Sequence, residues 1–63
     1  MREYASPDEL LGALRQVDVT PLVPHLNDGA LERIGSGDLA ISEMMVAAEW
    51  LGMEKPEDIF RGT

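Results

Sequence analysis

The sequence predicts an all-α fold, and three observations carry this prediction. Helix-capping residues and helix-ending glycines recur along the chain, and its two longest regular segments have apolar residues at helical spacing. No segment has a convincing strand pattern, because the one candidate, Leu39-Ala40-Ile41, is short and fits the helical period better. We therefore expect a small compact helical domain with two main helices, at about residues 7–17 and 39–51, and two or three short helices.

The first main helix is expected to begin in the segment Ser6-Pro7-Asp8-Glu9. Ser6 can accept a hydrogen bond from a free N–H of the first turn, and Glu9 can accept one from the Ser6 N–H. Pro7 occupies the first helical position, where a missing N–H is tolerated. Four apolar residues then share one face, which is typical of an amphipathic surface helix over about residues 7–17: Leu10, Leu11, Leu14 and Val17.

The middle of the chain is expected to form turns and short helices. Two prolines interrupt residues 20–26, where Thr20 is a candidate cap for one short turn. The turn signature at 27–29 follows, and we expect Asp28 to cap a short helix from Ala30 to Ile34 that Gly35 ends.

The second main helix is expected over residues 39–51, with Asp38 as its N-cap and Gly52 as its end. Its apolar residues point in almost every direction, so that only Ser42 and Glu49 form a polar strip and Glu43 is isolated among apolar neighbours. Such a helix is either buried on most sides or turned partly toward a second chain through Met44, Met45 and Trp50. A last short helix is expected over Pro56–Phe60, with its acidic residues in the first turn.

Length and composition exclude several classes of protein. The 63 residues suffice for a single acidic helical domain, 1–63, with 12 acidic and 5 basic residues and a formal net charge of -7. The absence of cysteine excludes a disulfide-stapled protein, a thiolate zinc module and a thiol enzyme. So few Lys and Arg residues argue against direct nucleic-acid binding. No apolar run is long enough to span a membrane and no signal peptide is evident, so we expect a cytoplasmic protein.

We expect no enzymatic activity, no cofactor and no metal. His25 is the only histidine, and nothing fixes Thr20 or Asp28 beside it as a nucleophile or an orienting acid. Calcium and phosphate loops are also poorly matched, because residues 27–32 lack the early calcium ligands and the glycines at 35–37 lack a following Gly-Lys-Ser/Thr.

One pattern resembles a known family. Leu39-Ala40-Ile41-Ser42-Glu43, followed by Ala47-Ala48-Glu49-Trp50-Leu51-Gly52-Met53 and Pro56–Phe60, is similar to the helix-turn-helix of excisionase-type DNA-binding domains. The resemblance implies that a recognition helix follows Gly52. The corresponding residues 54–60 carry three acids and one base, a composition that phosphate groups repel. A degenerate helix-turn-helix regulator is therefore the third hypothesis for function.

The charge distribution supplies the leading hypothesis. Between residues 38 and 58 one base accompanies six acids, which either keep the protein soluble or form a partner-binding acidic face: Asp38, Glu43, Glu49, Glu54, Glu57 and Asp58. Such a face would engage a larger protein with a basic, nucleic-acid-binding surface, as a nucleic-acid mimic does. In size, acidity and lack of cysteine the chain resembles small phage-encoded inhibitors such as anti-CRISPR proteins. The alternative is an oligomeric or assembly component, with a homodimer as one form, that associates through an apolar surface of Met44, Met45 and Trp50.

Overall fold

The computed structural model describes residues 4–60, and within that range all regular structure is helical. The described chain forms three α-helices, α1 (Pro7–Leu14), α2 (Ala30–Ser36) and α3 (Ile41–Trp50), and two 3-10 helices. The 3-10 helix η1 (Val23–His25) lies between α1 and α2, and η2 (Pro56–Phe60) follows α3. The prediction of a small compact helical domain is confirmed, with principal extents of 27 × 22 × 19 Å. None of the helices in residues 4–60 combines the length and the apolar character needed to cross a membrane.

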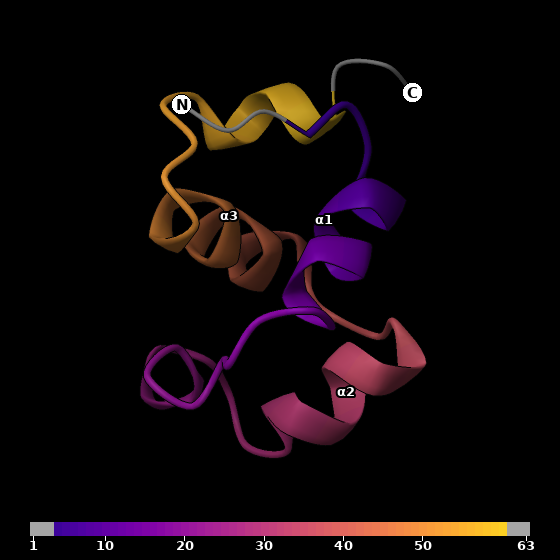
Figure 1. The fold of residues 1–63 in the computed structure, drawn as a ribbon, viewed down its shortest axis with the longest axis vertical. Helices are drawn as coiled ribbons and strands as arrows, with labels where there is room; N and C mark the ends of the chain where they lie inside the picture. The colour runs from indigo at the N-terminus through magenta and orange to yellow at the C-terminus, as the bar shows by residue number, and fades with distance from the viewer. Residues whose placement is uncertain (1–3, 61–63) are drawn as a thin grey trace.

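The helices form three tiers along the longest axis of the molecule (Figure 1). α1 and α3 lie in the middle, η2 lies beyond them at one end, and α2 lies at the other end. The closest packing joins α1, α3 and η2 to one another. Side chains from all of these elements and from the loops fill a single core, in which the largest fully buried residues are Leu10, Leu14, Leu22 and Ile59.

α1 begins where the sequence predicts and ends earlier. Ser6 Oγ accepts a hydrogen bond from Glu9 N at 3.3 Å, as expected, whereas the Glu9 carboxylate accepts from Ala5 N at 2.6 Å rather than from Ser6 N. The expected end near Val17 is wrong, because the helix stops at Leu14 and Val17 is 37% exposed. A local turn competes with the helix at this point, since the Asp18 carboxylate accepts a hydrogen bond from Thr20 N at 3.0 Å.

The junction between α2 and α3 also differs from the prediction. Gly37, at φ +81°, closes α2 through hydrogen bonds from Gly37 N to the Ile34 carbonyl and from Asp38 N to the Arg33 carbonyl. Asp38 therefore belongs to the end of α2 and is not the N-cap of the next helix. α3 begins at Ile41 with Ala40 as its N-cap. At the other end of α2 the N-cap is Gly29, at φ +76°, rather than Asp28.

The end of α3 follows the prediction. Gly52 adopts φ +99°, a left-handed conformation that glycine reaches without steric strain. Gly52 N donates to the Glu49 carbonyl and Met53 N donates to the Ala48 carbonyl, both at 3.0 Å, which is the Schellman arrangement. This closure turns the buried Met53 side chain into the core and directs the chain toward η2.

Candidate interaction surface

Glu43 departs furthest from the predicted acidic face, because its side chain is only 4% exposed. Its carboxylate forms a two-pronged ion pair with Arg33 of α2, with Nη1–Oε1 and Nη2–Oε2 distances of 2.5 and 2.8 Å. It also accepts hydrogen bonds from Asn27 N at 3.0 Å and from Ala40 N at 3.1 Å. Glu43 thus ties the turn at 27, the helix α2 and the start of α3 together. It is not available to a partner.

The surroundings of Glu43 stabilise its charged form. The hydrogen bonds from Arg33 lower the pKa of Glu43 from 4.5 to about 2, and the backbone donors Ala40 and Asn27 act in the same direction against the opposing effect of burial. The same contact raises the pKa of Arg33. Each carboxylate oxygen accepts two hydrogen bonds, one from Arg33 and one from the backbone, so the pair acts as a structural link between segments.

Like Arg33, Arg15 donates its side-chain hydrogen bonds to acceptors within the protein. Its guanidinium donates from Nε to the Ile34 carbonyl at 3.2 Å and from Nη2 to the Gly35 carbonyl at 3.3 Å. A cation there complements the negative end of the α2 dipole. Apart from the Arg33–Glu43 pair, residues 4–60 carry ten carboxylates and only two permanent cations, Arg15 and Lys55. The outer surface of the described molecule is therefore strongly anionic.

The remaining predicted acidic residues are accessible but are not gathered on one face. Glu49, Glu54 and Glu57 are exposed and follow the chain through the turn from α3 to η2, where Asp58 is half-buried. Asp38 is exposed before the opposite end of α3, and a ten-residue helix is about 15 Å long.

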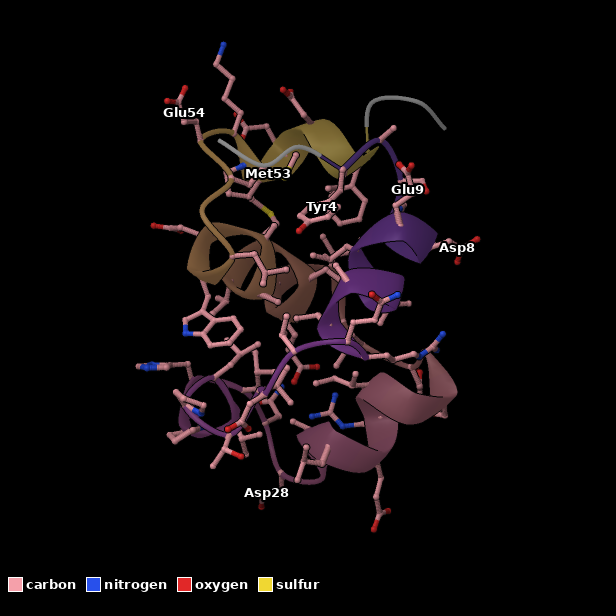
Figure 2. The ribbon with its side chains drawn as sticks, in the orientation of Figure 1. Tyr4, Asp8, Glu9, Asp28, Met53 and Glu54 are labelled. Atoms are coloured by element: carbon pink, nitrogen blue, oxygen red, sulfur yellow. The ribbon has the colours of Figure 1, made fainter. Side chains whose placement is uncertain are left out.

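Further carboxylates lie on other sides of the molecule. Asp8 and Glu9 lie in the first turn of α1, and Asp28 lies at the end of the molecule opposite Glu54 (Figure 2). Glu49, Glu54 and Glu57 are the exposed acidic residues that follow one another along the chain from α3 to η2, and we call these three residues the acidic edge.

The solvent-exposed side of α3 carries more apolar side chains than the exposed side of a helix usually does. Of the predicted apolar surface, Met44 packs against the core, Met45 is half-buried and Trp50 is 37% exposed. The sequence reasoning missed two residues of this face, Ile41 and Val46, which are 65% and 39% exposed. On the opposite side of α3 the small side chains of Ala47 and Ala48 are completely buried.

The exposed side chains of α3 form an ordered pattern. Residues four apart are neighbours on a helix, so Ile41 and Met45 form one apolar ridge and Val46 and Trp50 form a second. Ser42 and Glu49 lie between these ridges in projection down the helix. We call these six residues the α3 face: Ile41, Ser42, Met45, Val46, Glu49 and Trp50.

The three residues that could serve catalysis lie exposed in the segment between α1 and α2. His25 is exposed in η1 and Thr20 and Asp28 are exposed in the adjoining turns. Over residues 4–60 there is no detected pocket, and no three acidic or histidine side chains converge as metal ligands would.

The segment that the helix-turn-helix resemblance assigns to a recognition helix is η2. It is a five-residue 3-10 helix whose first turn carries Glu57 and Asp58. Its Ile59 side chain is completely buried, so the segment packs onto the core.

Comparison with protein families, with curated proteins and with solved structures finds no match to this chain.

Proposed function

We propose that this protein is a small, non-enzymatic binding protein whose acidic edge engages a basic surface on a larger protein. The observation that carries the proposal is the charge balance of the surface. Apart from the Arg33–Glu43 ion pair, the described residues include ten carboxylates and only two permanent cations. One of these cations, Arg15, donates its hydrogen bonds to backbone carbonyls. In the sharpest form of the proposal the partner binds nucleic acid, and the protein competes for its Lys- and Arg-lined groove.

The acidic edge suits this role better than the other carboxylates do. Glu49, Glu54 and Glu57 are exposed and come from successive segments joined by a turn that the Gly52 closure fixes. Their charges are therefore presented at a defined site, with Lys55 as the one base in that stretch of chain. A rigid set of charges binds without the ordering cost that a flexible acidic tail would incur.

The experiment is a charge reversal read by affinity capture. The variant Glu54→Lys/Glu57→Lys is compared with Asp28→Lys/Glu32→Lys, which changes the net charge equally at exposed positions outside the edge. We expect capture of nucleic-acid-binding proteins from a nuclease-treated lysate, elution of these proteins by duplex DNA, and loss of capture only in the first variant. Capture that both variants retain, or that DNA does not displace, contradicts the proposal.

The second candidate function is assembly through the α3 face. Ile41, Val46 and Trp50 lie exposed on one helix, which favours an apolar interface. Sedimentation velocity over a range of concentrations tests self-association, and a dimer that Val46→Ser dissociates and high salt does not would favour this candidate over the first.

A further inference from the structure

We propose that the α3 face is a docking site for a basic amphipathic helix of the partner protein. The inference rests on the proposed function and extends it, because it assigns an apolar contact and a partner structure that the acidic edge alone does not define.

The two ridges of the α3 face expose apolar side chains to solvent. Ile41 is 65% exposed, and Val46 and Trp50 are 39% and 37% exposed, while the opposite side of the same helix is completely buried at Ala47 and Ala48. Two parallel ridges of i, i+4 neighbours with smaller or polar residues between them form the surface into which a second helix packs its own side chains. A Trp at the end of one ridge is the residue type most often found as an interface anchor.

The charge on the α3 face decides what the docked helix must carry. Glu49 lies between the ridges, and a helix that covers them removes this carboxylate from water. Burial of a charge is unfavourable unless an opposite charge pairs with it. The C-terminal end of α3, where Glu49 is located, carries the negative end of the helix dipole and has no basic residue in its last turn. The docked helix must therefore place a Lys or Arg at this end.

A second copy of the chain does not meet this requirement. α3 contains no Lys or Arg, so a symmetric contact through the α3 face brings no basic side chain of α3 to Glu49. Each copy also carries a formal charge of -7, which opposes close approach of two copies. A helix with apolar residues on one side and basic residues along its edges satisfies both the ridges and Glu49. It also leaves its remaining basic residues free to reach the acidic edge.

Trp50 provides a direct measurement, because it is the only tryptophan in the chain and is part of the α3 face. The probe is a 20-residue synthetic peptide of Leu and Lys arranged as an amphipathic helix. Its control has the same composition in an order that gives no apolar side. We expect the amphipathic peptide to shift Trp50 emission to shorter wavelength and to bind at least tenfold more tightly than the control.

Variants locate the contact. Ile41→Ser/Val46→Ser is expected to weaken binding of the amphipathic peptide about tenfold, and Glu49→Gln to weaken it about fivefold at low salt. Leu31→Ser is the matched control, because Leu31 is 59% exposed on α2 and lies outside the face. Far-UV circular dichroism confirms that each variant remains helical.

The outcomes separate the two proposals. Equal binding of both peptides without a change in Trp50 emission overturns the docking site and leaves the acidic edge as the binding surface. A concentration-dependent Trp50 shift in the absence of peptide identifies a second copy as the occupant and also overturns it. A third outcome is that Ile41→Ser/Val46→Ser abolishes binding of the amphipathic peptide while Glu54→Lys/Glu57→Lys leaves that binding intact. This result supports the docking site and removes support from the acidic edge.

Discussion

Replacement of Glu43 by glutamine removes the charge from the most buried ionic contact of the described molecule. The lowering of the Glu43 pKa from 4.5 to about 2 corresponds to a contribution of about 3 kcal/mol to the free energy of unfolding at neutral pH. An amide accepts hydrogen bonds only through its oxygen, so the substituted side chain would place its NH₂ group against one backbone donor, Asn27 N or Ala40 N, and against one guanidinium nitrogen of Arg33. We expect Glu43→Gln to lower the free energy of unfolding by about 2–3 kcal/mol at pH 7, since breaking a buried ion pair costs this order of energy.

The contribution of Glu43 to the free energy of unfolding should decrease as the pH falls. Because the folded-state pKa is lowered, the unfolded protein binds more protons between pH 4.5 and 2, and the contribution of Glu43 is complete above that range and lost as the pH falls through it. Urea denaturation at pH 7 and pH 2.5 is the assay, and the difference between wild type and Glu43→Gln should shrink strongly at the lower pH. Glu49→Gln, at an exposed position of the same helix, is the control and should change stability by less than about 0.5 kcal/mol. A Glu43→Gln variant as stable as wild type at pH 7, or a difference that is the same at both pH values, would refute the reasoning.

Three further substitutions test other parts of the fold. Gly52→Ala places a residue with a Cβ at φ +99°, where no neighbouring atom would clash with the added methyl group. Backbone strain alone should therefore lower the free energy of unfolding, measured by urea denaturation, by about 1–2 kcal/mol. No loss of stability would contradict the left-handed conformation at this position. Arg15→Met removes two hydrogen bonds to the carbonyl end of α2 and should lower the melting temperature by about 4–8 °C. Arg15→Lys keeps the positive charge and should lower the melting temperature less; equal effects of the two substitutions would contradict a contribution of the charge. Ile59→Ala empties a fully buried position between η2 and the core and should cost about 2–5 kcal/mol, and an exposed equivalent, Leu31→Ala, should cost less than about 1 kcal/mol.

Helix ends governed by local chemistry were predictable from the sequence. Ser6 caps α1 and Gly52 ends α3 because both act through hydrogen bonds within a few residues of the chain. The wrong N-cap assignment at Asp38 has a related cause. A helix-ending glycine, Gly37, and a candidate N-cap, Asp38, are adjacent in the sequence. In the structure Asp38 N donates to the Arg33 carbonyl, so Asp38 completes the C-terminal closure of α2 and the next helix begins later.

The features that the sequence did not reveal depend on contacts between distant segments. Glu43 has the appearance of a surface acid, and its burial follows from Arg33, which approaches it from another helix. The side of α3 that faces water was also ambiguous, because apolar residues surround that helix and only the packing of its neighbours selects Ala47 and Ala48 for the core. Ile41 and Val46 are exposed as a result of that selection, and no periodicity in the sequence distinguishes them.

The two arginine contacts have a consequence for how the molecule opens. The tight packing of the fold joins α1, α3 and η2, whereas α2 is linked to the rest largely through side chains, with Arg15 holding its C-terminal carbonyls and Arg33 reaching Glu43. Segments held by few contacts open locally while the remainder stays folded. We therefore expect the stretch from the turn at 27 to the start of α3 to open locally, so that its amide hydrogens exchange with solvent sooner than those of α1 and α3. Protonation of one carboxylate, Glu43, would be sufficient to shift that opening equilibrium and to make a small rigid molecule partly adaptable in acid.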